Sequence, residues 1–175
     1  MALTATADKS TETSIIKSLG MVNPAKIVMS PERRRITVVK CKKAEMFSKL
    51  DWLIEMVHQK GINTPKTMIF CNMSDMANVA NYLLFKLGCK AYNSKTADTK
   101  DCLIDIFHSM TWTASKDKFL ASFKKVDSVK RIVVASTVLS MGVHFPDVKY
   151  LVNWGPARTL LDYHHEAGRA GRDVS

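Results

Sequence analysis

The fold is decided by residues 131–173, which read RIVVASTVLSMGVHFPDVKYLVNWGPARTLLDYHHEAGRAGRD. A short apolar run, 132–135, passes directly into the small hydroxylated residues Ser136 and Thr137. A second apolar run, 150–152, leads through a Gly-Pro pair to a polar segment that ends in two arginines. Buried strands whose carboxyl ends open into Gly, Ser and Thr loops are typical of an α/β sheet that presents polar groups to a ligand. This stretch therefore predicts the ligand-bearing edge of such a sheet.

Upstream of this stretch, short apolar segments alternate with amphipathic ones. The pattern predicts strands at 36–39, 66–72, 89–92, 102–107, 131–135 and 150–152, and helices at 10–19, 44–60, 74–87, 115–125 and 159–170. Ser10 or Thr11 is expected to cap the first helix and Ser74 the third. Strands that alternate with helices predict βαβ units, and hence an α/β fold with a mostly parallel sheet and helices on both faces.

The charge balance points to a polyanionic partner. Lysine and arginine outnumber the acidic residues by 26 to 16, which gives a net charge of +10. Neutralising phosphates with such groups supplies most of the non-specific affinity for nucleic acid. Solvated lysine faces that keep the protein soluble are the alternative. No apolar run approaches the roughly 18 residues of a membrane span, and the N-terminus lacks the features of a signal peptide, so we expect an intracellular protein.

Cysteine and histidine do not indicate a metal site. The four cysteines, Cys41, Cys71, Cys89 and Cys102, are scattered without a C-x-x-C pair, whereas zinc favours closely spaced thiolates. Reduced structural thiols are therefore expected. His164 and His165 are adjacent on a predicted helix, where neighbouring side chains point about 100° apart and do not face one ion together.

Arg169 and Arg172 lie in the segment GRAGRD, at the end of the last predicted helix. Their three-residue spacing puts both guanidinium groups on one face of a helical turn, and the flanking glycines allow close approach of the backbone. Such a pair suits the terminal phosphates of a nucleotide. Two arginines that complement the helix C-terminus are the alternative. His165 and Glu166, one turn earlier, could orient the guanidinium groups.

The order of these segments resembles that of the RecQ family of helicases, and more broadly superfamily 2. The matching segments are ALTATA at 2–7, MIFCN at 68–72, VVASTVLSMGV at 133–143 with FPDVK at 145–149, and YHHEAGRAGRD at 163–173. The resemblance covers nearly the whole chain. It implies a RecA-like three-layer sandwich, of the kind in which two lobes clamp ATP between them while nucleic acid runs across both.

The resemblance also implies roles for individual residues. The catalytic pair is Arg169 and Arg172, with Arg172 as the arginine finger; the nucleotide-binding residues are Gly142, His144, His165 and Glu166; and the nucleic-acid-binding residues are Thr4, Thr6, Cys71, Asn72, Ser136, Thr137 and Met141. Four positions depart from the family pattern: Ser140 stands where Gly is usual, His144 where Asp or Asn is usual, His165 where Gln is usual, and Met73-Ser74 where Ser-Arg is usual.

The same resemblance predicts the domain organisation. Residues 1–29 are expected to be the end of a first RecA-like lobe, 30–35 a linker around Pro31, and 36–175 the second lobe. The sequence contains no G-x-x-x-x-G-K-[ST] loop and no D-E-x-H segment to hold ATP and Mg²⁺. We therefore expect a fragment that begins at the third helicase motif and ends just after the sixth, and that is inactive without a first lobe.

These expectations combine into one functional prediction. The chain is expected to be the second motor lobe of an ATP-dependent 3′-to-5′ DNA helicase that acts on single-stranded or forked DNA in the nucleus, in repair or recombination. A non-catalytic nucleic-acid-binding module is the alternative. An RNA helicase of the DEAD-box kind ranks lower, because that family normally ends in H-R-x-G-R-x-x-R and this chain in G-R-A-G-R-D.

Overall fold

The computed structural model describes residues 2–3, 8–28, 41–94, 98–108, 110, 112–136, 145, 147–155 and 159. The chain divides into two compact units, Met1–Val38 and Val39–Ser175. The predicted domain boundaries, the predicted strand 36–39 and all of the predicted helix 159–170 except Thr159 lie outside the described residues and stay predictions. Within the described part of the chain, no helix has both the length and the apolar character needed to cross a membrane.

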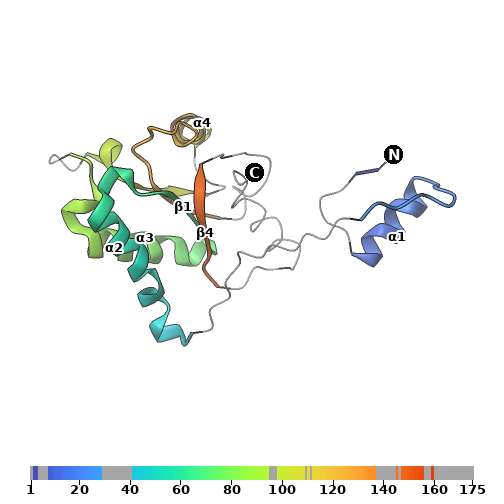
Figure 1. Ribbon diagram of the computed structural model, residues 1–175, viewed down its shortest axis with the longest axis horizontal. Coiled ribbons are helices and arrows are strands. Elements are labelled where there is room, and N and C mark those ends of the chain that lie inside the picture. Colours follow the sequence, from blue (N-terminus) through green and yellow to red (C-terminus); the bar gives the residue numbers. More distant parts are fainter. Residues whose placement is uncertain are drawn as a thin grey trace. The chain divides into compact units, whose positions relative to one another are not determined.

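The described part of the first unit contains one helix, α1, over Lys9–Ser18 (Figure 1). Its cap is Asp8, and not Ser10 or Thr11 as expected: the Asp8 carboxylate accepts a hydrogen bond from the Thr11 backbone N–H at 2.7 Å. The Ser10 hydroxyl donates to the same carboxylate, so Ser10 supports the cap instead of providing it. A carboxylate at this position also suits the positive end of the helix dipole.

The second unit is built on a parallel sheet. Its described strands are β1 (Lys66–Phe70), β2 (Ile104–Phe107), β3 (Ile132–Ala135) and β4 (Val148–Asn153), in the order β2-β3-β1-β4. Every pairing between them is parallel. Phe70 at the end of β1 is in register with Ala135 of β3 and with Asn153 of β4. All four strands therefore end at the same edge of the sheet, and the predicted α/β class is confirmed.

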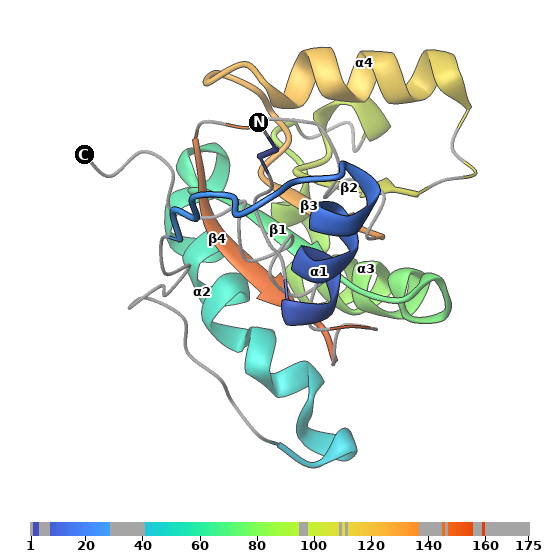
Figure 2. The same ribbon diagram turned by 90° about the vertical axis from the view of Figure 1, so that its right-hand side faces the viewer.

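Helices cover both faces of the sheet (Figures 1 and 2). On one face, α2 (Asp51–Lys60) and α3 (Met73–Leu87) form a core with the strands that includes Leu53, Val57, Val79, Leu83, Ile69, Ile104, Ile132 and Val134. On the other face, α4 (Thr113–Phe123) buries Phe119 and Phe123 against Met68, Phe70, Phe107 and Val133. The alternation of side chains along each strand sends successive residues into opposite cores. The expected three-layer arrangement is confirmed.

One predicted element was wrong in type, and another was wrong in its first part. The predicted helix 44–60 is α-helical over Asp51–Lys60, but the segment before it forms two 3₁₀-helices, η1 (Lys43–Glu45) and η2 (Phe47–Leu50). The predicted strand 89–92 is a 3₁₀-helix, η4 (Gly88–Ala91), from which only Tyr92 makes a strand-like bridge, to Cys102. Two further 3₁₀-helices, η3 (Gly61–Asn63) and η5 (Thr99–Asp101), lie in connections. A short apolar run does not by itself distinguish these conformations.

A buried lysine lies at the amino end of the sheet. Lys66 begins β1 and is 1% exposed. Its ammonium group donates to the carbonyl oxygens of Phe123 and Lys125, at 2.6 Å each. It also pairs with the Asp147 carboxylate at 2.6 Å and lies 4.9 Å from the centre of the Phe123 ring. Burial lowers the pKa of Lys66, and the hydrogen bond and charge of Asp147 oppose that shift.

Candidate functional site

The carboxyl edge of the sheet brings together the segments that follow the strands. The ladder continues past the strand ends: the Cys71 N–H donates to the Ala135 carbonyl at 3.0 Å, and the Ser136 N–H donates to the Phe107 carbonyl at 3.1 Å. On the β4 side, the Trp154 N–H donates to the Phe70 carbonyl at 2.7 Å. These bonds fix the positions at which the chain leaves the sheet. Loops at this edge are where open α/β sheets bind ligands.

Asn72 is the polar residue that leaves β1. It is exposed and occupies the N-cap position of α3, where its backbone carbonyl accepts from the Asp75 N–H at 3.0 Å. The expected cap, Ser74, lies inside the helix instead. The Asn72 side chain makes no capping hydrogen bond. Its amide therefore faces solvent with both donor and acceptor capacity, as a ligand contact requires.

Cys71, directly before Asn72, is 7% exposed and is described with the buried residues. Burial, and to a lesser degree the charge of Asp75, raises the pKa of its thiol to about 12. The thiol is therefore protonated at neutral pH and has little nucleophilic or metal-binding character. Cys71 thus supports the position of the β1 exit through its packing, and any contact with a ligand from this residue would come from its backbone.

Ser136 leaves β3 beside these residues. It is 7% exposed, and its hydroxyl oxygen is buried without a hydrogen-bond partner within the described part of the chain. A buried hydroxyl with no partner costs free energy, roughly 1–3 kcal/mol, and each such group calls for an explanation. A bound ligand that supplies the missing partner is one such explanation. Within the described residues, the Ser136 hydroxyl thus has hydrogen-bonding capacity that a ligand could use.

The exit of β4 contains residues that the sequence reasoning missed. The amide oxygen of Asn153 is buried and, within the described residues, lacks a hydrogen-bond partner. Trp154 is 8% exposed and its ring lies 5.1 Å from that of Phe47, which in turn lies 4.8 Å from the Tyr82 ring. The aromatic cluster fixes the place where β4 ends. A polar residue directly after an apolar strand was the signal that could have identified Asn153.

Three of the predicted site residues lie in the described structure, and Cys71, Asn72 and Ser136 come together at this edge. The other ten lie outside the described residues: Thr4, Thr6, Thr137, Met141, Gly142, His144, His165, Glu166, Arg169 and Arg172. In the described ranges, no group of three or more His, Cys, Asp or Glu side chains could hold a metal ion. The described edge offers an amide, a hydroxyl and backbone groups, which suit a phosphate or sugar contact.

Comparison with known proteins shows the family to which the chain is similar. Residues 48–174 match the family described as helicase conserved C-terminal domain. The ATP-dependent DNA helicase RecQ of Pasteurella multocida is 30% identical over 178 residues, which cover 99% of this chain and 24% of that protein. The chain thus spans about a quarter of the length of this relative.

RNA helicases are similar over a shorter part of the chain. A putative DEAD-box ATP-dependent RNA helicase 43 of Arabidopsis thaliana is 28% identical over 129 residues, 71% of this chain and 20% of that protein. The solved structure of Saccharomyces cerevisiae Dbp5 bound to RNA and ADP BeF3 has a TM-score of 0.63 and 21% identity, and the match covers 97% of this chain and 41% of that chain. At this identity the structural similarity shows the fold alone.

Proposed function

The chain belongs to the helicase conserved C-terminal domain family, and we propose that it serves as the second motor lobe of a RecQ-like, ATP-dependent DNA helicase. The observation that carries this proposal is the convergence of Asn72 and Ser136 at one edge of the sheet. The Asn72 amide makes no capping hydrogen bond, and the Ser136 hydroxyl has no hydrogen-bond partner among the described residues. By the resemblance, Asn72 belongs to a motif near the nucleic-acid face, and Ser136 belongs to a motif between nucleotide and nucleic acid.

On this proposal, one strand of DNA runs along the carboxyl edge of the sheet in the second unit. The Asn72 amide and the Ser136 hydroxyl contact its phosphates or sugars. Cys71, Thr137 and Met141 belong to the same proposed set of nucleic-acid-binding residues, as do Thr4 and Thr6 of the first unit. Contacts to phosphate and sugar fix the position of a strand but read no sequence. The net charge of +10 supports the binding of such a polyanion. The expected behaviour is therefore sequence-independent binding with a strong dependence on salt.

DNA is proposed over RNA because of how far each resemblance extends. The RecQ relative aligns over 99% of the chain, whereas the DEAD-box relative aligns over 71%. A nuclear location and a role in DNA repair or recombination belong to the same proposal.

The nucleotide would be held by the second group of predicted residues. Two guanidinium groups, those of Arg169 and Arg172, suit the terminal phosphates of ATP, with Gly142, His144, His165 and Glu166 nearby in the motifs. ATP hydrolysis supplies the free energy for movement along DNA. Arg172 would stabilise negative charge at the γ-phosphate as an arginine finger, and Arg169 would assist it. Mg²⁺ would be held by acidic residues of a first lobe, since this sequence has no D-E-x-H segment.

The proposal is tested with the chain alone. Fluorescence anisotropy with a labelled dT12 oligonucleotide should show binding that weakens as salt rises, and a rU12 oligonucleotide should bind less tightly. ATP turnover should be absent in the same preparation, because the sequence has no P-loop. DNA-stimulated turnover by this chain alone, or a failure to bind dT12 at low salt, would refute the assigned role.

A non-catalytic nucleic-acid-binding module is the second candidate. It is favoured by His144, which replaces a carboxylate or amide expected near the ribose of the nucleotide. The two candidates differ in one measurement. A two-lobe protein that joins this chain to a RecQ-type P-loop lobe hydrolyses ATP if the first candidate holds, and binds DNA without hydrolysis if the second does.

A further inference from the structure

Trp112 is the most exposed of the three tryptophans. Its side chain is 85% exposed, against 38% for Trp52 and 8% for Trp154. Met110, two residues earlier, is 76% exposed. Burial of a tryptophan ring contributes about 2–3 kcal/mol of stabilisation, which a ring exposed to water does not supply. Single exposed apolar residues are common on protein surfaces. The position of Trp112 in the fold, however, suggests a function for its exposed ring.

Trp112 lies at the same edge of the sheet as the proposed DNA track. It belongs to the connection between β2, which ends at Phe107, and α4, which begins at Thr113 (Figure 2). The Phe107 carbonyl accepts the hydrogen bond from the Ser136 N–H, so this connection leaves the sheet directly beside Ser136. The ring therefore belongs to a strand exit next to one that the proposed track uses.

The backbone of Trp112 is held by hydrogen bonds, whereas its ring is exposed to solvent. Its carbonyl accepts hydrogen bonds from the N–H groups of Ser115 and Lys116, at 2.9 Å each, which makes it the N-cap of α4. Its side chain makes no capping hydrogen bond. A large aromatic ring is thus held out from the start of a regular helix. A ring on a fixed backbone loses less conformational entropy when it binds than a ring on a mobile loop.

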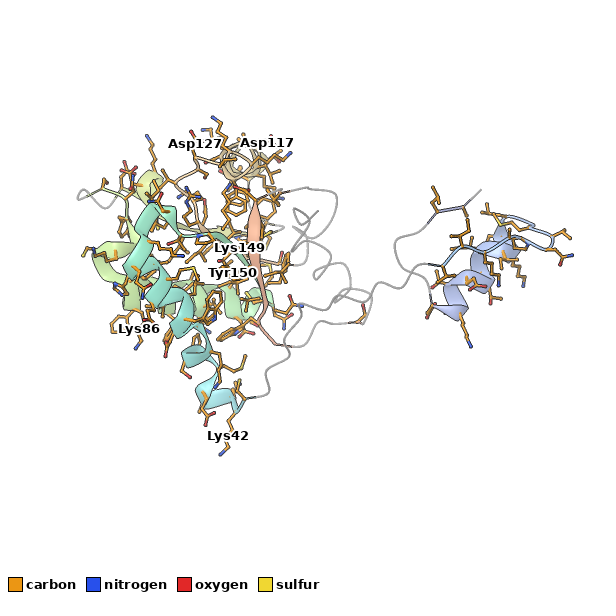
Figure 3. All side chains as sticks on the ribbon, viewed as in Figure 1. Lys42, Lys86, Asp117, Asp127, Lys149 and Tyr150 are labelled. Carbon is orange, nitrogen blue, oxygen red and sulfur yellow. The ribbon has the colours of Figure 1, made fainter. Side chains whose placement is uncertain are left out.

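The surroundings favour a nucleic-acid partner over a protein. The first turn of α4 has no acidic residue, and the helix contains Lys116 and Lys118 against a single acid, Asp117, labelled in Figure 3. Thr113 and Ser115, beside Trp112, are polar and exposed. A specific protein interface buries roughly 800 Å² on each partner around an apolar centre, and two apolar side chains among polar neighbours do not provide one. A nucleobase needs only a single aromatic face.

We propose that Trp112 is a stacking platform for a base of single-stranded DNA. The inference rests on the proposed function and adds a contact to the base, where the other proposed residues contact phosphate or sugar. Base–aromatic stacking tolerates any sequence, because every base has a π-face. The contact would hold the strand at the β2 exit without reading its sequence.

The test compares variants of the full chain by anisotropy with labelled dT12. Trp112→Ala should weaken binding about tenfold, which corresponds to the loss of one stacked base, while Trp112→Phe should weaken it by less. The slope of log affinity against log salt should stay the same, because no phosphate contact is removed. Phe85→Ala is the matched control. Phe85 is 84% exposed but lies in the last turn of α3, at the other end of the sheet, so this variant should bind dT12 with the wild-type affinity.

A fully abasic 12-mer separates stacking from other contacts. The wild-type chain and Trp112→Ala should bind it with equal affinity, because it offers no base to stack. Equal binding of dT12 by both proteins would overturn the stacking role and leave the DNA-binding role intact. A tenfold loss that persists on the abasic strand would also overturn it, since the ring would then contact something other than a base. No dT12 binding by the wild-type chain would overturn the DNA-binding role and the stacking role together.

Discussion

The ammonium group of Lys66 lies 2.6 Å from the carboxylate of Asp147, at the end of the sheet opposite to the candidate site. The same ammonium donates to the carbonyl oxygens of Phe123 and Lys125 at the end of α4. One buried side chain therefore joins the start of β1, the end of α4 and the turn before β4. The segment between β3 and β4, which contains the predicted nucleotide-binding residues Gly142 and His144, ends at this anchor.

Lys66→Met should lower the free energy of unfolding by about 3 kcal/mol, because it leaves a carboxylate and two helix-end carbonyl groups without their donor. Urea unfolding followed by circular dichroism measures the change. Lys130→Met is the control: Lys130 lies 3.7 Å from Asp105 in a more exposed pair, and its loss should cost less than about 1 kcal/mol. Equal losses for the two variants would contradict the anchoring role of Lys66.

The stability gap between the wild-type chain and Lys66→Met should widen as the pH rises. Burial, the largest cause, holds the pKa of Lys66 below its ordinary value of 10.5 in the folded chain. Between the lowered pKa of the folded chain and 10.5, the unfolded chain keeps a proton on Lys66 that the folded chain has released. The free energy of unfolding of the wild-type chain therefore increases as the pH rises through this window. Below that window the cost of the buried charge is fully present. Urea unfolding of both proteins at pH 8 and pH 10 measures the difference in their free energies of unfolding. A difference that is smaller at pH 10 than at pH 8 would contradict this prediction.

The thiols should fall into two classes. Cys41 and Cys89 are exposed, whereas Cys71 and Cys102 are buried. The pKa of Cys71 is raised to about 12, so almost no thiolate is present at pH 8. Ellman's reagent at pH 8 should modify the exposed pair quickly and the buried pair only after unfolding, as peptide mapping by mass spectrometry would show. Rapid modification of Cys71 in the folded chain would mean that the β1 exit is more open than described.

Ser136→Ala should separate stability from binding. The variant removes a buried hydroxyl that has no partner within the described residues, so the free energy of unfolding should stay the same or rise by about 1 kcal/mol. Binding to dT12 should weaken severalfold if that hydroxyl contacts DNA. Ser128→Ala is the matched control: Ser128 is also buried, but its hydroxyl accepts a hydrogen bond from the Lys130 N–H at 3.1 Å. That variant should lose about 1 kcal/mol of stability and keep its DNA affinity.

The sheet could be predicted from the sequence because its strands are buried on both faces. Met68, Ile69, Val133 and Val134 are inaccessible to solvent, and such strands appear in the sequence as continuous apolar runs. The position of Ser136 directly after a predicted strand marked it as a candidate, whereas Cys71 and Asn72 were identified from the resemblance. The end of the chain was interpreted from the resemblance of its motifs, and its residues lie outside the described structure.

The remaining differences arise from contacts that pattern reasoning does not include. In η2, the apolar spacing of Phe47 and Leu50 fits a 3₁₀-helix as well as an α-helix, since residues three apart align in both. The predicted strand 66–72 begins at Lys66, but the burial of this side chain depends on Asp147 and Phe123, which are distant in the sequence. The exposure of Trp112 could not be inferred either, because a tryptophan before an amphipathic helix is usually assigned to the core.

The most direct test is ATP turnover by a protein that joins this chain to a RecQ-type P-loop lobe, measured with single-stranded DNA. The motor-lobe role predicts DNA-stimulated turnover that Arg172→Ala reduces by about a thousandfold, while dT12 binding stays at the wild-type level. Turnover that survives Arg172→Ala, or DNA binding that falls in parallel with turnover, would contradict the assignment of Arg172 as an arginine finger and of the chain as a motor lobe.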